Sequence, residues 1–372
     1  MKVVFDAYWW VSGPPSLRHV LRETVLEWSR LFPQDELHLV VRRAQLDAAT
    51  AAAPPGSVLH TTSLWPQALS ATHAVAAVAR RIGADLALTH NFAARLPERT
   101  LSAVYLHDVL FATNPEWFTL AERAYFSFML RWIQRADVVF TSSESEANRI
   151  VRNSRAERVL PVGLGLSTEL LADPLDEPDP TLTPRRFVLT VGRVNARKNL
   201  DALVAAALAS GRISPDRPLV IVGPPDGRRA RLGDRAQQAI ATGALRFTGY
   251  VSEARLRWYY RNTSLFAFLS LGEGFGMPPV EAAAFAAPTL VSELPVFRET
   301  LGDRARYVDP TSLPGIAIAI AEEVDAGERR PASPLVDERL AAAHDWNSTV
   351  WAMRSWASGH TAGRSSRAGA GR

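Results

Sequence analysis

The sequence predicts an α/β protein with two Rossmann-like domains, each built around a parallel sheet. Short apolar runs alternate with amphipathic helical patterns in both halves of the 372-residue chain. Such alternation is typical of parallel sheets that are covered by helices on both faces. A proline-rich stretch separates the two runs of alternation. With 47% apolar residues, the chain can fill two hydrophobic cores.

The N-terminal domain is predicted to span residues 1–170. Its expected helices cover residues 17–31, 67–82 and 116–135. The last of them has an apolar face at three- and four-residue spacing, formed by Trp117, Ala121, Ala124, Phe128 and Trp132. Short apolar runs predict its strands at residues 3–5, 37–41, 58–61, 86–89, 103–106 and 138–141, and residues 159–166 are predicted to hold its last strand and the exit from it.

Residues 171–184 are predicted to form a linker between the domains, because this stretch holds four prolines and four acidic residues without apolar periodicity. The second domain is expected over residues 185–345. A helix over residues 346–357 should cross back to the first domain, and the polar, basic tail 358–372 is predicted to be disordered. The second domain lacks a G-x-G-x-x-G motif, so dinucleotide binding has no support. Its expected strands cover residues 187–191, 219–222, 245–250, 264–271, 289–292 and 306–308, with helices at 200–209, 230–241 and 252–261.

Composition excludes several classes of function. The chain has no cysteine, which rules out disulfides, thiolate catalysis and cysteine-ligated zinc. The start, MKVVFDAYWW, places Asp6 inside an apolar stretch and predicts a first strand instead of a signal peptide. No apolar run approaches the ~18 residues that span a bilayer. A cytoplasmic location is expected, and association with the inner face of a membrane is compatible with it. Nucleic-acid binding is not expected, because no basic helix is present.

The most informative stretch is residues 270–287, SLGEGFGMPPVEAAAFAA. A buried strand leads into a loop with three glycines, and an alanine-rich helix follows near Pro278 or Pro279. This arrangement directs backbone N–H groups and the positive end of a helix toward an anionic or polyhydroxylated ligand. Glu273 lies in the loop and Glu281 is expected in the first helical turn, where the dipole favours its ionised form. The simpler interpretation is a strand-to-helix turn with two surface glutamates.

The pattern G-E-G-F-G-x-P-x-x-E-A resembles the E-x7-E signature of glycosyltransferase family 4. The resemblance implies that Glu273 contacts the hydroxyls of a donor sugar and that Glu281 contacts the ribose of its nucleotide. It also implies that the backbone N–H groups of Phe275, Gly276 and Met277 face the sugar.

A second motif follows the first strand of the second domain. Gly192 permits a sharp turn, and Arg193 and Lys198 place two cations before a helix N-terminus, where a diphosphate would be held. Lys198 and Lys2 are the only lysines among 42 basic residues, which indicates that Lys198 is needed as a compact charge. The segment resembles the phosphate clamp of the same family. Solvated basic residues on a loop are the simpler interpretation. A weaker resemblance places the backbone of Val251 at the nucleotide base.

Two loops of the first domain resemble family loops as well. The segment WWVSGPPS resembles the glycine-rich loop near the donor phosphates and the acceptor, although only Gly13 matches the usual glycine pair. The segment that begins at His107 and Asp108 and ends in P-E-W-F resembles a loop of bacterial mannosyltransferase-like members. That resemblance implies that His107 faces the sugar. Asp108 is expected to fix either the loop or the imidazole.

Together the resemblances imply a GT-B fold whose two domains face each other across a cleft. They imply a retaining, metal-independent hexosyl transfer from a nucleotide-sugar to a lipid-linked or polysaccharide acceptor, with GDP-mannose as the specific expectation. No cofactor and no metal are expected. A nucleotide-sugar 2-epimerase and a non-catalytic nucleotide-sugar-binding protein remain alternatives. The residues expected to act in catalysis are His107, Arg193, Lys198 and Glu273.

Overall fold

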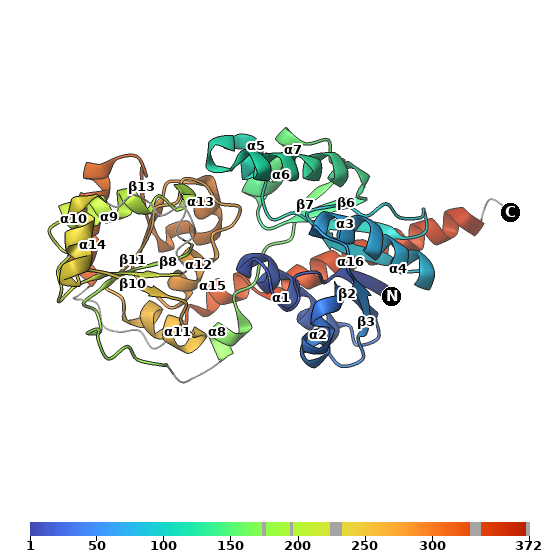
Figure 1. Cartoon of the computed structure of the whole chain (residues 1–372), viewed down its shortest axis with the longest axis horizontal. Helices are drawn as coiled ribbons and strands as arrows, with labels where there is room; N and C mark the ends of the chain where they lie inside the picture. Colours follow the sequence, from blue (N-terminus) through green and yellow to red (C-terminus); the bar gives the residue numbers. More distant parts are fainter. Residues whose placement is uncertain (173–175, 194–195, 224–232, 328–335, 370–372) are drawn as a thin grey trace. The chain divides into compact units, whose positions relative to one another are not determined.

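The computed structural model describes residues 1–172, 176–193, 196–223, 233–327 and 336–369. The chain forms two compact units (Figure 1). The first combines residues 1–165 with the residues from 344 onward, and the second holds residues 166–343. Each unit contains one parallel sheet with helices packed against it, as the alternation of apolar runs and helical patterns predicts.

The sheet of the first unit has seven parallel strands in the order β3-β2-β1-β4-β5-β6-β7. Its centre is wholly buried, because Val3, Val4 and Phe5 have no exposed surface. Within the range 159–166, which was predicted to hold the last strand and its exit, the strand ends at Pro161. The strands are β1 (Lys2–Asp6), β2 (Glu36–Arg42), β3 (Val58–Thr62), β4 (Leu86–His90), β5 (Leu101–Tyr105), β6 (Val138–Thr141) and β7 (Val159–Pro161).

Helices of the first unit pack against the sheet through aliphatic and aromatic side chains. Val75 and Ala79 join the core beneath β1 and β4, and Met129, Ile133 and Ile150 join the core beneath β5 and β6. The helices are α1 (Pro15–Leu31), α2 (Leu46–Ala52), α3 (Gln67–Leu69), α4 (Val75–Ile82), α5 (Leu110–Thr113), α6 (Leu120–Trp132), α7 (Glu144–Asn153) and α16 (Trp346–Gly369).

Much of the apolar face predicted for helix α6 is exposed. Ala121 and Ala124 are exposed, and Phe128 is 52% exposed. A second apolar stripe contains Met129 and continues to Ile133 in the 3-10 turn directly after the helix, and both side chains pack against the sheet. Both stripes have helical spacing, so the periodicity alone does not show which of them faces the core.

The last helix, α16, belongs to the first unit and packs on α1. Its buried side chains are Trp346, Val350, Met353 and Ala357, which recur on one face. The predicted disorder of residues 358–372 is wrong for residues 358–369, because α16 continues to Gly369. The imidazole of His360 stacks on Trp356 with 4.4 Å between ring centroids and lies 2.8 Å from Arg158. These contacts extend the helix past residue 357.

The sheet of the second unit has six parallel strands in the order β10-β9-β8-β11-β12-β13. Successive side chains of β11 point to opposite faces of this sheet, and the two faces have different cores. Leu265 and Ala267 join an aliphatic cluster, whereas Phe266 and Phe268 contact aromatic rings on the other face. The strands are β8 (Val188–Val191), β9 (Leu219–Val222), β10 (Leu245–Gly249), β11 (Leu265–Phe268), β12 (Thr289–Ser292) and β13 (Arg306–Val308).

Two groups of helices cover this sheet. Leu203 of α9 and Ile320 of α14 pack in the aliphatic cluster, and Tyr260 of α11 and Phe285 stack on the aromatic side. No helix among the described residues is long and apolar enough to cross a membrane. The helices are α8 (Thr168–Ala172), α9 (Leu200–Ala209), α10 (Asp234–Thr242), α11 (Glu253–Asn262), α12 (Met277–Ala284), α13 (Pro295–Leu301), α14 (Leu313–Gly327) and α15 (Glu338–Ala343).

The predicted linker is bound to the second unit over its described part, residues 176–184. Asp176 accepts a hydrogen bond from the buried Arg257 at 2.8 Å, and Asp179 accepts one from Tyr259 at 2.7 Å. Asp176 and Asp179 of the predicted linker are therefore partners of basic and phenolic groups on α11. Residues 173–175 lie outside the described part of the chain.

Three glycines lie at the carboxyl ends of β8, β9 and β10, the first two directly after their strands and the third as the last residue of β10. Gly192, Gly223 and Gly249 all have positive φ, at 147°, 133° and 70°. Gly192 donates a hydrogen bond to Val222 at 2.9 Å, and Gly223 donates one to Gly249 at 2.9 Å. A Cβ on Gly223 would lie 2.3 Å from the carbonyl oxygen of Gly192. These residues allow the backbones to meet closely at the edge where ligands of parallel sheets bind.

We predict that Gly223→Ala destabilises the protein by about 3 kcal/mol or more, because it combines a backbone clash with an unfavourable φ. Urea unfolding followed by circular dichroism measures the change. Gly233→Ala is the matched control, since its Cβ would meet no atom of the described residues within 4 Å. Equal stability of the two variants would contradict the close approach of the β8 and β9 ends.

Candidate active site

The loop after β11 holds its acidic residue by contacts with a neighbouring loop. The Glu273 side chain is buried, with 7% of the residue exposed. Ser270 donates a hydrogen bond from Oγ to Glu273 Oε1 at 2.5 Å. The amide of Leu271 donates to the carbonyl of Arg197 at 2.8 Å, and the Arg197 guanidinium donates to the carbonyl of Gly272 at 2.7 Å. These bonds thus hold the loops after β8 and β11 together at the carboxyl edge of the sheet.

Two cations surround the Glu273 carboxylate. Arg197 Nη1 lies 2.5 Å from Oε2, and Lys198 Nζ lies 2.7 Å from Oε1. Burial raises the pKa of Glu273, but the charges of Arg197 and Lys198, with hydrogen bonds from Lys198 and Ser270, outweigh this effect and hold its pKa at about 2. Glu273 is therefore ionised at every physiological pH.

The two cations of the expected phosphate clamp lie in different environments. Lys198 lies beside Glu273 and over the ring of Phe268, 4.4 Å from its centroid. Arg193 is exposed, and the cation that shares Glu273 with Lys198 is Arg197. Sequence reasoning missed Arg197, although it directly precedes Lys198 in the short turn Ala196–Lys198.

The environment of Glu281 differs from the one expected. Helix α12 begins at Met277, so Glu281 lies beyond the first turn, outside the range in which a helix dipole favours a carboxylate. Tyr260 donates a hydrogen bond from its hydroxyl to Glu281 Oε2 at 2.8 Å. Burial raises the pKa of Glu281 to about 7, although the bond from Tyr260 opposes this change. The carboxyl is therefore partly protonated near neutral pH.

The remaining predicted contacts of the second unit lie at the same edge of the sheet. The side chain of Phe275 is buried, and Met277 opens α12. Gly276 has φ of 93°, and a Cβ there would lie 2.4 Å from the Phe297 ring, so the turn requires glycine. Val251 lies between β10 and α11. The contacts of these residues with a ligand stay predictions.

In the first unit, His107 pairs with a histidine that the sequence analysis did not single out. His90, the last residue of β4, lies with Nδ1 3.2 Å from Nε2 of His107, and the two rings stack with 5.4 Å between centroids. Burial lowers the pKa of His90 to about 4 and the pKa of His107 well below its ordinary value. Both imidazoles are therefore neutral at physiological pH, and they donate or accept hydrogen bonds without carrying charge.

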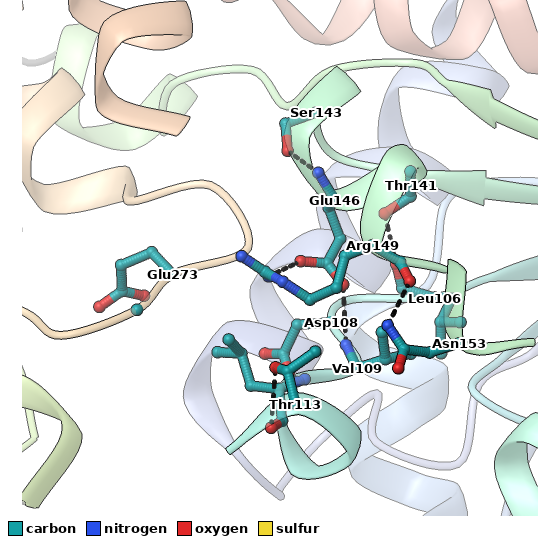
Figure 2. A network of polar contacts seen from close by, with 12 residues as sticks. Leu106, Asp108, Val109, Thr113, Thr141, Ser143, Glu146, Arg149, Asn153 and Glu273 are labelled. Carbon is teal, nitrogen blue, oxygen red and sulfur yellow. Dashed lines mark hydrogen bonds and ion pairs between the residues drawn. The ribbon is translucent and has the colours of Figure 1, made fainter. Parts of the chain in front are cut away.

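A buried carboxyl supports the loop that carries His107. Figure 2 shows Glu146 of α7 directed at this loop, where it accepts a hydrogen bond from the Val109 amide at 2.8 Å. Asp108 accepts a hydrogen bond from the Leu110 amide at 3.2 Å, which places it as a loop-fixing residue. Burial raises the pKa of Glu146 to about 8 despite the neighbouring Arg149. No sequence motif pointed to Glu146.

The glycine-containing loop after β1 is held by arginine and tryptophan side chains. A Cβ on Gly13 would lie 2.3 Å from the ring of Trp9. Arg42 lies over that ring at 5.2 Å and donates to the carbonyl of Ser12 at 2.6 Å. At the end of β1, Asp6 accepts a hydrogen bond from Gln67 at 2.5 Å, and burial raises its pKa to about 7. The sequence offered no signal for this pair beyond the place of Asp6 at a strand end.

Sequence comparisons relate the chain to sugar-transferring enzymes. Residues 176–330 match the family model of glycosyl transferases group 1. The chain is 26% identical to O-antigen chain mannosyltransferase B of Escherichia coli over 62% of its own length and 63% of that protein. It is 29% identical to the serotype-specific mannosyltransferase WbdA of Escherichia coli over 53% and 26% of the two lengths. It is 27% identical to GDP-mannose:cellobiosyl-diphosphopolyprenol alpha-mannosyltransferase of Komagataeibacter xylinus over 57% of its own length and 53% of that protein.

Solved structures share the fold over most of the chain. Sucrose-phosphate synthase of Thermosynechococcus elongatus has a TM-score of 0.67 at 17% identity and covers 98% of this chain and 100% of its own. Anabaena HepE in complex with UDP and glucose has a TM-score of 0.64 at 16% identity, and the match covers 96% of this chain and 100% of HepE. The GT-B fold class and the resemblance to glycosyltransferases, both expected from the motifs, are confirmed. The matches cover between about a quarter and two thirds of these curated relatives' lengths.

We predict that Glu281→Gln changes how stability depends on pH. Because the folded pKa of about 7 exceeds the ordinary value of 4.5, Glu281 contributes stability that is fully present below pH 4.5 and is lost as the pH rises through 7. The free energy of unfolding, measured with urea, should therefore fall less between pH ~5 and pH ~8 for Glu281→Gln than for the wild type. The exposed Glu322→Gln should keep the wild-type dependence. If Glu281→Gln also keeps it, the Glu281 carboxyl is not protonated more readily in the fold.

Proposed function

We propose that this protein is a retaining glycosyltransferase that moves a hexosyl group from a nucleotide-sugar to a lipid-linked or polysaccharide acceptor. The observation that carries the proposal is the cluster of Glu273, Arg197 and Lys198 at the carboxyl edge of the second sheet. It lies within the residues that match the family model. A permanently ionised carboxylate suits hydrogen bonds from sugar hydroxyls, and adjacent cations suit a diphosphate.

The transfer step rests on electrostatic stabilisation. The bond between the anomeric carbon and the diphosphate breaks, a bond to the acceptor oxygen forms on the same face, and the acceptor proton passes to a phosphate oxygen. Lys198 neutralises the charge that builds on the departing diphosphate, together with Arg193 from the same loop. Glu273 holds the sugar in place for attack, and His107 donates or accepts a hydrogen bond to the sugar as a neutral imidazole. These cations supply the positive charge that a divalent metal supplies in other transferases.

The donor and acceptor follow from the names of the relatives. Two of them are mannosyltransferases of E. coli, and a third uses GDP-mannose and a diphosphopolyprenol-linked acceptor. We therefore propose GDP-mannose as the donor, a cytoplasmic location and peripheral association with the membrane that holds the acceptor. The relatives are transferases by name, which favours transfer over epimerisation or binding alone. A thermal-shift screen of nucleotide-sugars identifies the donor, because saturation at a hundred times Kd stabilises by about 2.7 kcal/mol.

We predict that Lys198→Ala lowers turnover with the donor from that screen by about two orders of magnitude, the usual cost of one lost charge contact in the transition state. Lys198→Arg should restore only part of the rate, because a planar guanidinium does not replace a point charge. The other lysine, Lys2, lies exposed in the first unit, and Lys2→Ala is the control. Near-normal turnover of Lys198→Ala would remove the proposed role of Lys198.

We further predict that the two glutamates separate in their effects on binding and rate. Titration calorimetry with GDP should show that Glu281→Ala weakens binding by about 1.5–3 kcal/mol, the scale of a charged hydrogen bond. Glu273→Ala should leave GDP affinity almost unchanged and lower the rate of transfer. Glu322→Ala, on the exposed face of α14, should change neither. Loss of GDP affinity in Glu273→Ala alone would reverse the assigned roles.

A further inference from the structure

The outer face of α6 carries apolar side chains that no part of the chain covers among the described residues. Leu120 is 79% exposed and Phe128 is 52% exposed, and Ala121 and Ala124 between them are exposed as well. On the opposite side, Met129 of α6 and Ile133, directly after the helix, already pack in the core. The outward apolar stripe is therefore not needed to hold α6 on its own sheet.

Arginines flank this stripe. The C-terminal part of α6 borders a surface hollow of 610 Å³, lined by Phe128, Arg131, Trp132, Gln134, Arg135 and Arg155. A second hollow of 320 Å³ shares Trp132 and Arg135 and adds Arg80 and Arg95. No carboxylate lines either hollow within the described part of the chain. The guanidinium of Arg135 lies over the ring of Trp132, 4.2 Å from its centroid.

This combination of groups has the chemistry of a membrane-surface contact. Exposed leucine and phenylalanine enter the boundary between headgroups and acyl chains, while arginines bind lipid phosphates. Tryptophan prefers the headgroup level because its ring is apolar and its N–H is polar. A phosphate-binding surface for nucleic acid alone would not require Leu120 and Phe128 to project into solvent. The positive charge complements anionic lipids in particular.

We propose that the outer face of α6, with Arg155 beside it, binds a bilayer that contains anionic phospholipids. This inference deepens the proposed function, because it assigns a surface to the peripheral membrane association. It concerns α6 and neighbouring arginines of the first unit, apart from the cluster around Glu273. Binding to vesicles is measured without donor or acceptor, so its failure and a failure of the transfer chemistry are distinguishable.

The test is co-sedimentation of the full chain with vesicles of phosphatidylglycerol and phosphatidylcholine in equal parts, compared with phosphatidylcholine alone. The wild type should bind the anionic vesicles and lose binding as salt is added. Arg131→Gln with Arg135→Gln should lower the partition coefficient by about 30-fold, given the usual contribution of each basic residue near an anionic surface. Leu120→Ser with Phe128→Ser should lower it by about tenfold or more.

Matched controls lie in the second unit. Ile318→Ser removes a side chain that is 57% exposed on α14, and Arg235→Gln removes an exposed arginine on α10. Both should bind vesicles like the wild type, and all variants should unfold at wild-type urea concentrations. Equal binding to neutral vesicles, or wild-type binding by both double variants, would overturn the proposal. So would loss of binding in the arginine variant alone, because it would show a general polyanion surface.

Discussion

The charge of one buried carboxylate constrains the whole carboxyl edge of the second sheet. Taking Glu273 out of water is costly unless cations and hydrogen bonds surround it. Arg197, Lys198 and Ser270 supply both. The same arginine also bonds the backbone of the loop that carries Glu273, so the loops after β8 and β11 cannot move independently without separating these charges. The site is thereby organised before any ligand binds.

Three other buried acids are compensated less fully than Glu273, and their pKa values move the opposite way. Glu281 and Asp6 rise to about 7, and Glu146 rises to about 8, in each case chiefly because of burial. Glu281 has a phenol as its partner and Asp6 has an amide, so neither bond offsets the loss of water. Glu273 therefore keeps a fixed charge, whereas the charges of Glu281, Asp6 and Glu146 depend on pH near neutrality.

The sequence predicted nearly all strands, because buried parallel strands appear as short apolar runs. The sequence does not show which face of a helix is buried where two faces have the same apolar spacing. Both stripes of α6 have helical spacing, and the choice between them depends on packing with strands far away in the chain. Arg197 was missed because local spacing does not show that it and Lys198 both reach Glu273. The pairs His90 with His107 and Gln67 with Asp6 form only when separate strand ends meet.

The first unit is built from two separate stretches of the chain, and this has a consequence for synthesis on the ribosome. Asp35 has a fully buried side chain and is neutralised by the N-terminal amine and by Arg354 of α16. Residues 166–343 emerge from the ribosome before Arg354 does. Until then, Asp35 lacks one of its cations, and the surface of α1 that α16 covers stays open to water. The second unit can therefore fold as a complete body while the nascent first unit still awaits its closing helix.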